Sequence, residues 1–317
     1  MKNLLNKDRH ITRLLVIMAI VLAAMAVLNP SVFYSASNFS SMAVQFPELG
    51  FLSIAAALVL MSGGIDLSIT GTAVFSGIVA ARIMLASDSP DGPSVMVVVL
   101  ACAAALLVGL ACGAVNAVLV AKVGITPMLV TLGTMNLFTG IGIVLTKGSA
   151  LSGFPASFLA IGSGRLLGIP VPLLLFVLAT IILAFFLNKT KLGYKLCIYG
   201  SNPVASFFSA INNTKVVFTT YVMSGLISSI AGIIMVSRVN TAKADFGSSY
   251  GLQALLVAVL GGVDPSGGSG KAAGIFIAIV TLQFLSSGFN LLHVSSFLKD
   301  LTWGALLVFV MVLNVVN

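Results

Sequence analysis

Charged residues are scarce in this chain of 317 residues: 8% are charged, 59% are hydrophobic, and the mean hydropathy is +1.15. A soluble domain usually carries about 25% charged residues, because its surface faces water. No segment here is both long and polar enough to form a separate soluble domain. Most of the protein surface must therefore face lipid, and we expect a single membrane domain over residues 1–317.

Cysteine and histidine are also rare. Cys102, Cys112 and Cys197 show neither metal-ligand spacing nor a paired pattern, and His10 and His293 are isolated. We therefore predict no metal site and no cofactor. The formal charge of +8 would suggest a nucleic-acid partner in a soluble protein. Here the basic residues stand at the ends of apolar runs, which indicates orientation in a lipid bilayer and no nucleic acid.

About ten apolar stretches are expected to form membrane helices, which predicts an all-α polytopic fold. The first stretch resembles a signal peptide but lacks a clear small-x-small cleavage site, so we expect it to remain as a span. The eighth is too short to cross alone and is expected to be extended, broken or re-entrant. The predicted spans are Leu14–Leu28, Met42–Met61, Ile69–Leu85, Val95–Val120, Pro127–Leu145, Val171–Leu187, Val216–Val236, Tyr250–Leu260, Ala272–Gly288 and Phe297–Val315.

Lys and Arg in short loops predict the orientation of the spans. Lys2, Lys7, Arg9 and Arg13 precede the first span and place the N-terminus in the cytoplasm. An even number of spans then places the C-terminus there too. Further basic residues fall inside on this alternation, whereas the outer loops carry a mixed set that includes Asp88, Asp91, Lys147, Arg165, Arg238, Lys243, Asp245, Lys299 and Asp300.

Two glycines and an acid follow the second span, in Met61-Ser-Gly-Gly-Ile-Asp-Leu-Ser-Ile-Thr-Gly71. A carboxylate at the bilayer centre costs about 3 kcal/mol on insertion scales, so Asp66 should face water, protein or a cavity. Gly63 and Gly64 can break the helix, and Ser68 offers a hydroxyl. Asp66 is expected to N-cap the third span, and a role in a translocation path is compatible with that cap.

A second copy of the pattern reads Gly261-Gly-Val-Asp-Pro-Ser-Gly-Gly-Ser-Gly270. Asp264 and Pro265 are expected to form a cap and first-turn pair ahead of a span. The shared signature is consistent with duplicated halves and with broken or re-entrant helices at Gly261 and Gly262. A nucleotide-binding loop is excluded, because Lys271 is followed by Ala and not by a hydroxyl residue.

The fifth span is unusually polar. Its polar residues recur at three- and four-residue spacing, hence roughly on one face: Thr131, then Thr134 or Asn136, then Thr139. Neutral hydroxyls and amides suit an uncharged, hydroxylated solute, and hydrogen bonds between helices are the alternative. The predicted translocation path comprises Asp66, Ser68, Thr131, Thr134, Asn136, Thr139, Gln283 and Asn290.

Glu48 follows Pro47 near the outer end of the second span. A role in gating and simple exposure to solvent both fit this position.

The cytoplasmic loop at about 188–213 is the one inside loop large enough to dock a soluble partner. Asn202 can cap a short helix and Pro203 is preset for its first turn, so we expect a helix at about Pro203–Ile211. It would carry Phe207 and Phe208. Exposed aromatic residues there predict a partner surface, and an interfacial helix on lipid headgroups is the alternative.

Together these motifs resemble the permeases of ribose-type ABC importers, which also serve xylose, arabinose, galactose and the sugar-derived signal autoinducer-2. The resemblance covers nearly the whole chain. It rests on Ser62-Gly-Gly-Ile-Asp-Leu-Ser68, Pro127-Met-Leu-Val-Thr-Leu-Gly-Thr134, Gly140, Gly193, Ile198, Gly200, Asn202-Pro203, Ala205, Ala210-Ile211, Tyr221-Val-Met-Ser-Gly225, Ala231-Gly232, Ala258-Val-Leu-Gly-Gly262, Gly267-Gly-Ser-Gly270 and Gly274.

The resemblance implies a multi-pass transport subunit of the bacterial inner membrane, not an enzyme, and one that binds no ATP itself. It implies as partners a second permease subunit, identical or different, two cytoplasmic ATPase modules or one fused tandem ATPase, and an extracytoplasmic solute-binding protein. The loop helix would be the coupling helix that enters a groove of the ATPase. Its implied residues are Gly200, Asn202, Pro203, Ala205, Phe207, Phe208, Ala210 and Ile211.

Three other classes remain as alternatives. An ion- or proton-coupled secondary transporter would tend to carry ionisable residues deep in several spans, whereas only Asp66 and Glu48 qualify here. An intramembrane enzyme would need a nucleophile with His, paired acids or a metal set, and the spans show no such pattern. A receptor or structural subunit is compatible with the composition. The solute itself cannot be read from the sequence.

Overall fold

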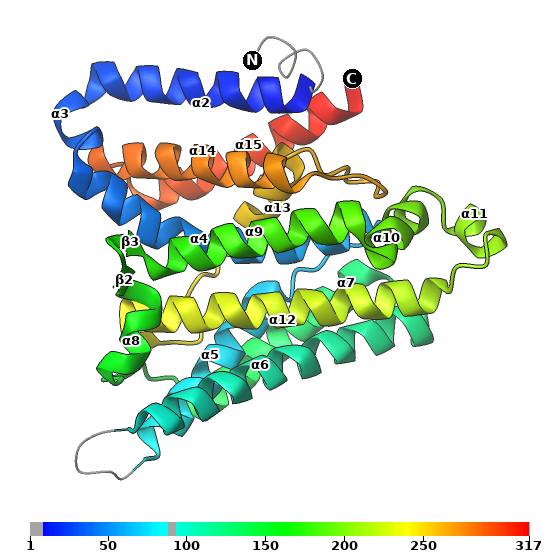
Figure 1. Ribbon diagram of the computed structural model, residues 1–317, viewed down its shortest axis with the longest axis horizontal. Coiled ribbons are helices and arrows are strands. Elements are labelled where there is room, and N and C mark those ends of the chain that lie inside the picture. Colours follow the sequence, from blue (N-terminus) through cyan, green and yellow to red (C-terminus); the bar gives the residue numbers. More distant parts are fainter. Residues whose placement is uncertain (1–8, 88–92, 317) are drawn as a thin grey trace.

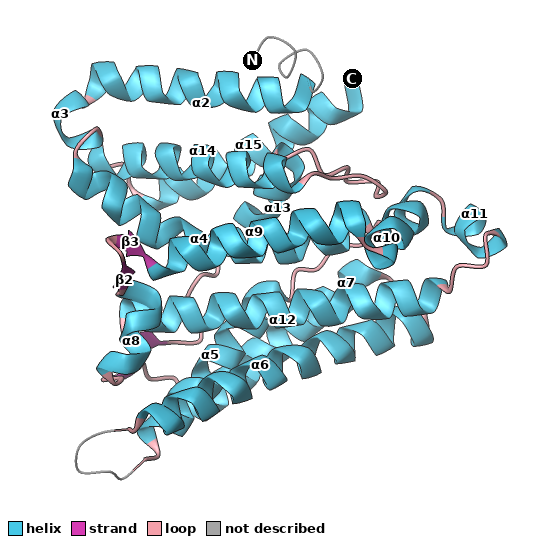
Figure 2. Ribbon diagram, in the orientation of Figure 1, coloured by secondary structure: helices cyan, strands magenta, loops and turns pink. Residues whose placement is uncertain are grey.

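The computed structural model describes residues 9–87 and 93–316. Within these residues the chain is helical apart from loops and four two-residue strands (Figures 1 and 2). The long helices run between two ends of the molecule. One end carries α10 and α11, and the other carries α3, α8 and the β2–β3 hairpin. The predicted all-α polytopic fold is confirmed.

Each predicted span coincides with a helix of the structure. Seven of the described helices are long and apolar enough to cross a membrane, while α5 and α13 are shorter apolar helices. At 1.5 Å per residue, the 11 residues of α13 rise only about 16 Å, roughly half the hydrocarbon thickness. The short eighth span is therefore confirmed. The span helices are α2 Arg9–Leu28, α4 Ala36–Met61, α5 Ile69–Leu85, α6 Val95–Val118, α7 Pro127–Thr146, α9 Val171–Lys189, α12 Asn213–Val239, α13 Tyr250–Leu260, α14 Ala272–Leu291 and α15 Ser296–Val316.

Shorter elements connect these helices. The strand β1 pairs antiparallel with β4, which joins the loop after α7 to the loop after α12, and β2 pairs antiparallel with β3 just before α9. The connecting elements are α3 Pro30–Phe33, the π-helix η1 Leu119–Val123, β1 Leu151–Ser152, α8 Ala156–Ser163, β2 Arg165–Leu166, β3 Ile169–Pro170, α10 Lys191–Ser201, α11 Pro203–Phe208 and β4 Thr241–Ala242.

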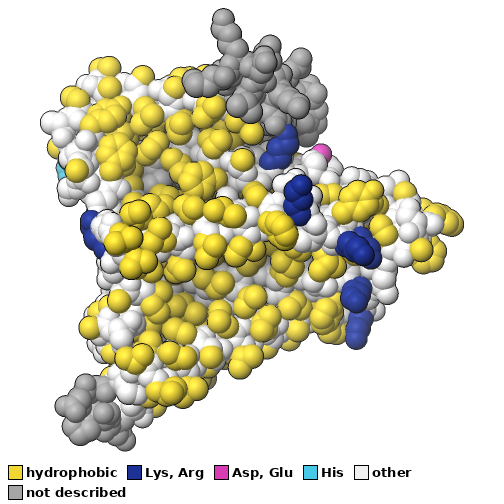
Figure 3. Space-filling model, viewed as in Figure 1, with side chains coloured by type: hydrophobic (Ala, Val, Ile, Leu, Met, Phe, Trp, Pro, Cys, Tyr) yellow, Lys and Arg dark blue, Asp and Glu magenta, His cyan; other side chains and the backbone are white. Residues whose placement is uncertain are grey.

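The core of the molecule lies around α4. Nearly every residue from 46 to 61 is buried, and α9, α12, α13 and α14 pack against this helix. By contrast, α6 and α9 direct large apolar side chains such as Leu107, Ile181 and Phe185 outward. Hydrophobic side chains cover most of the face in Figure 3, while most of the Lys and Arg side chains visible there gather at the end with α10 and α11. This distribution fits a membrane-embedded bundle.

The helices α6 and α12 pack with their backbones nearly in contact. A Cβ atom on Gly109 would lie 2.5 Å from the carbonyl oxygen of Gly225, and one on Gly225 would collide with the carbonyl oxygen of Gly109. One turn along, a Cβ on Gly113 would lie 2.5 Å from the carbonyl oxygen of Tyr221. Small residues that permit such an approach are enriched at helix interfaces in lipid.

We call the end with α10 and α11 the inner end and the opposite end the outer end, following the orientation predicted from basic residues. That orientation relative to a membrane stays a prediction. Lys2, Lys7, Asp88 and Asp91, on which it partly rests, lie outside the described residues.

The inner loop is more ordered than predicted. The helix α9 continues to Lys189, and the Thr190 hydroxyl then caps α10 by accepting a hydrogen bond from the Gly193 N–H at 3.1 Å. Leu196 on α10 is buried against the bundle. Within residues 188–213, α11 and its flanks are the exposed segment that projects from the inner end (Figure 1).

Candidate translocation path and coupling surface

Asp66 lies in the break between α4 and α5, where hydroxyl groups surround it. Its Oδ1 atom accepts hydrogen bonds from the Ser68 N–H at 3.0 Å and the Ser68 Oγ at 2.6 Å. Its Oδ2 atom accepts a bond from the Ser224 Oγ of α12 at 2.8 Å. The Asn116 Nδ2 of α6 donates in turn to the Ser68 Oγ at 2.7 Å. These bonds join the start of α5 to both neighbouring helices.

The predicted N-cap role of Asp66 is wrong in detail. The helix α5 begins at Ile69 with Ser68 at its N-cap position, so Asp66 stands two residues earlier and closes a turn onto the Ser68 N–H. Asp66 and Ser68 are 2% and 1% exposed. In this conformation both therefore hold helices together, and their role in a translocation path stays a prediction.

Replacing Ser224 with Ala is expected to destabilise the protein by about 1–3 kcal/mol, because one oxygen of the buried Asp66 carboxylate would lose its donor. The matched control is Ser76→Ala, since the buried Ser76 hydroxyl bonds only carbonyl oxygens of its own helix. Thermal unfolding of the purified variants in detergent measures both changes. Equal losses for the two variants would contradict a special role for the Ser224 bond.

The second Gly-Gly-x-Asp motif repeats the local turn but not its surroundings. The Asp264 Oδ1 accepts a hydrogen bond from the Ser266 N–H at 2.8 Å, as Asp66 does from Ser68, yet Asp264 is exposed. The expected cap and first-turn pair of Asp264 and Pro265 is wrong, because α14 begins only at Ala272. The residues between them form a loop instead. Whether the two halves are duplicated stays a prediction.

Both predicted helix breaks are confirmed, and they meet the end of α10. The Gly268 N–H donates to the Met61 carbonyl at 2.8 Å. A Cβ on Gly200 would collide with that same carbonyl and would lie 2.5 Å from the Gly268 nitrogen. Gly63, Gly267 and Gly268 have φ values of 76°, 92° and 88°, which side chains rarely tolerate. We call residues 61–63, 200–201 and 267–268 the glycine joint.

Hydrogen bonds from two asparagine side chains hold α11 in place. The Asn202 Oδ1 accepts hydrogen bonds from the Val204 and Ala205 N–H groups at 3.0 and 2.9 Å, which confirms the predicted cap. Sequence reasoning missed Asn213, whose Nδ2 donates to the Pro203 carbonyl at 2.8 Å and whose Oδ1 accepts from Ser206 at 2.8 Å.

The helix α11 is shorter than predicted. It ends at Phe208, and Ala210, with φ at 56°, turns the chain back toward α12. Phe207 and Phe208 are 69% and 83% exposed, with ring centroids 5.9 Å apart, so the predicted exposed aromatic pair is confirmed. Ile211 is buried in the core and anchors the segment.

The polar residues of α7 do not all share a face. Thr131 is buried and donates to the Ile65 carbonyl at 3.1 Å, and Thr139 lies beside Gly71 of α5. Thr134 is buried and bonds its own helix. Asn136 instead points outward and donates to the Leu132 carbonyl of its own helix at 3.0 Å. The threonines therefore face the bundle, and the asparagine faces the surface of the subunit.

The two remaining path residues lie near the outer end. Gln283 of α14 is partly buried and lines a cavity, whereas Asn290 is exposed and accepts a hydrogen bond from the Lys299 Nζ at 2.5 Å. They are separate from the Asp66 cluster.

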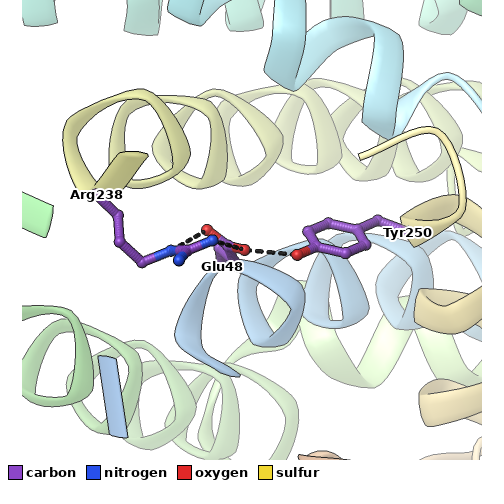
Figure 4. Close-up of polar contacts among 3 residues, drawn as sticks. All are labelled: Glu48, Arg238 and Tyr250. Carbon is purple, nitrogen blue, oxygen red and sulfur yellow. Dashed lines mark hydrogen bonds and ion pairs between the residues drawn. The ribbon is translucent and has the colours of Figure 1, made fainter. Parts of the chain in front are cut away.

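The buried Glu48 forms a triad with the partly buried Arg238 and Tyr250 (Figure 4). The Arg238 Nε and Nη2 donate to the two carboxylate oxygens at 2.9 and 2.8 Å, and the Tyr250 hydroxyl donates to Oε1 at 2.7 Å. Glu48 is 1% exposed, so the alternative of simple exposure to solvent is wrong, and its carboxylate is paired with Arg238. The triad joins α4, α12 and α13.

Two cavities share Arg238 and Gln45 in their linings, and all three triad residues line one of them. The outer vestibule has a volume of about 550 Å³ and is lined by Ala36, Ser37, Ser40, Ser41, Val44, Gln45, Arg165 and Arg238. The inner cavity, of about 80 Å³, is lined by Gln45, Phe46, Glu48, Leu49, Arg238, Tyr250, Gln253, Leu282, Gln283, Ser286 and Trp303.

Comparisons with known proteins agree with this architecture. The family model described as branched-chain amino acid transport system / permease component matches residues 38–311. The chain is 33% identical over 297 residues to the ribose import permease protein RbsC of Bacillus subtilis (strain 168), covering 93% of this chain and 89% of the relative. Identity to RbsC of Escherichia coli (strain K12) is 35% over 297 residues, covering 92% and 88%.

A third relative is named for a different substrate. The autoinducer 2 import system permease protein LsrD of Photorhabdus temperata is 30% identical over 270 residues, covering 83% of this chain and 79% of the relative. No solved structure gives a significant match. The chain therefore belongs to this permease family, among the ribose-type ABC importer permeases, and is a multi-pass transport protein of the inner membrane.

Proposed function

We propose that this permease carries a small, neutral, hydroxylated solute into the cell and that a separate ATPase, docked on α11, drives the movement. The single observation that carries the proposal is a series of contacts at the inner end, which leads from α11 through α10 to the two helix breaks. An exposed aromatic pair sits on a short, well-capped helix. The preceding helix, α10, then touches both helix breaks through the glycine joint. Movement of α11 would thus reach the interior of the bundle through backbone contacts.

The class of solute is supported by the relatives and by the polar groups. The relatives are named for ribose and for autoinducer 2. In this chain the outer vestibule is lined mainly by serines and Gln45, and the inner cavity adds Gln253 and Gln283. Hydroxyl and amide side chains both donate and accept hydrogen bonds, as sugar hydroxyls do.

A second permease subunit, identical or different, is proposed to pack on the outward face of α7. Asn136 lies on that face, where an amide facing lipid is unfavourable. Gly133 and Gly140 have open space beside them, which would allow close approach of another helix. Two ATPase modules or one fused tandem ATPase, and an extracytoplasmic solute-binding protein, would complete the importer.

The test is reconstitution in proteoliposomes with a cognate ATPase and solute-binding protein, which are to be sought among the neighbouring genes. Labelled D-ribose and labelled autoinducer-2 are the probes. We expect at least one to accumulate only when ATP and both partners are present. Accumulation by the permease alone, driven by an ion gradient, would contradict the proposal and favour a secondary transporter.

A further inference from the structure

We propose that the outer vestibule is a binding site for a neutral polyol and that the Glu48–Arg238–Tyr250 triad is the gate between this site and the inner cavity. The polyol class rests on the proposed function, whereas the gate rests on geometry alone.

The vestibule has the chemistry of a polyol site. Ser41 and Gln45 follow Ser37 at four-residue steps, and Ser40 stands three residues after Ser37, so the four residues form one continuous neutral face of α4. Its volume of about 550 Å³ lies in the range of small-molecule sites, about 300–1,000 Å³.

Two arginines border the vestibule, yet they do not make it a strong anion site. The Arg238 charge is paired with Glu48 at 2.8 Å. Arg165 is exposed to solvent and donates to the Ser40 hydroxyl. Solvent screens an exposed charge, so a phosphate group would gain little there, whereas both guanidinium groups can donate to neutral hydroxyls.

In this conformation the triad blocks passage from the outer vestibule to the inner cavity. Arg238 and Gln45 line both cavities, so the two cavities adjoin at these residues. The inner cavity, at about 80 Å³, has room for two or three waters and not for a sugar ring. It nevertheless carries Gln253, Gln283 and Ser286 beside Trp303, polar groups that would meet a hydroxylated solute once the cavity widened.

Each member of the triad stands where the backbone can change direction. Glu48 follows Pro47, which cannot donate a hydrogen bond inside α4. Arg238 is in the last turn of α12, two residues before Asn240 with φ at 53°. Tyr250 is the first residue of α13, three residues after Gly247 with φ at 70°. Three charge-assisted bonds therefore join the proline-containing middle of α4 to the end of α12 and the start of α13.

The experiment measures cysteine accessibility in cells that express the full chain. A charged, membrane-impermeant methanethiosulfonate is added outside to Ser41→Cys in the vestibule, to Gln283→Cys in the inner cavity and to Ser228→Cys, a fully buried control between helices. The unsubstituted chain gives the background from its own cysteines. We expect fast modification at position 41, slow modification at 283 and none at 228.

Adding Tyr250→Phe or Glu48→Gln is expected to speed modification at position 283 about tenfold, because a lost bond to a charged group weakens the closed state. The rate at position 41 should stay the same, and position 228 should stay unreactive, which shows that the fold is intact. A rate at 283 that already equals that at 41, or that neither substitution changes in the intact fold, would overturn the gate.

Excess D-ribose or D-xylose should slow modification at position 41. Protection by D-ribose 5-phosphate and not by the neutral sugars, or no protection by any of them, would overturn the polyol site. These modification rates need neither ATPase nor uptake, so they can support the site even if ATP-driven import of ribose fails. Likewise, ATP-driven import can be observed even if the sugars give no protection at position 41.

Discussion

Replacing Phe207 and Phe208 together with Asp should abolish solute uptake while the protein still inserts into the membrane. The two rings are exposed side chains on a helix that Asn202 caps and Asn213 bonds at Pro203 and Ser206, so the folded subunit loses little when they change. Aromatic anchors of an interface commonly contribute 2 kcal/mol or more each. Losing both should weaken ATPase binding at least about a thousandfold.

The matched variants separate docking from folding. Phe207→Leu with Phe208→Leu keeps the apolar surface and should retain most uptake, and Ser209→Asp adds a charge at the neighbouring exposed position and should be mild. Uptake, protein in the membrane fraction and co-purification of the ATPase are measured for each. Normal uptake by the double Asp variant removes α11 as the docking site. Loss of membrane insertion in the same variant would favour the interfacial-helix interpretation.

The substitution Gly225→Val should prevent stable folding. Any Cβ at this position collides with the Gly109 carbonyl oxygen and lies 2.8 Å from the Gly113 nitrogen, all of them backbone atoms that no rotamer change can move aside. Forcing α6 and α12 apart should cost at least the upper end of the 1–3 kcal/mol that overpacking typically carries, and would also disturb the Ser224 bond to Asp66 one residue away.

Gly304→Val is the control, since Gly304 also lies within a membrane helix but has open space around its Cβ position. The yield of monodisperse protein in detergent and its melting temperature report the outcome. We expect near-normal behaviour for the control and mostly aggregated protein for Gly225→Val. Similar yields for both would show that α6 and α12 do not depend on this contact.

The spans could be predicted because length and hydropathy are properties of a continuous segment. The inner loop shows where such reasoning fails. The helix α10 carries Lys191, Lys195 and two glycines, so its composition does not distinguish it from a loop. Its order comes from the Thr190 cap and from packing of Leu196 on the bundle. The cap at Asn202 was predictable because its partners follow within three residues.

Sequence reasoning placed the chemically important residues but not their partners. Asp66 was recognisable as an acid at a helix break, yet Ser224 lies 158 positions away. Glu48 and Arg238 are separated by 190 positions. Neither pairing has a local pattern, because tertiary packing alone brings these helices together. The face of Asn136, by contrast, was predictable, because at about 100° per residue it lies about 200° around the helix from Thr134.

The three backbone segments of the glycine joint are so close together that they can hardly move relative to one another. Side chains absorb small displacements by changing rotamer, but here carbonyl and amide groups meet directly. A shift of α10 by about an ångström would therefore reach the start of the α4–α5 break and the loop before α14 at the same instant. The two interrupted regions would respond in unison, so any order in which the outer and inner sides open would have to be imposed at the outer end, where the Glu48 triad lies.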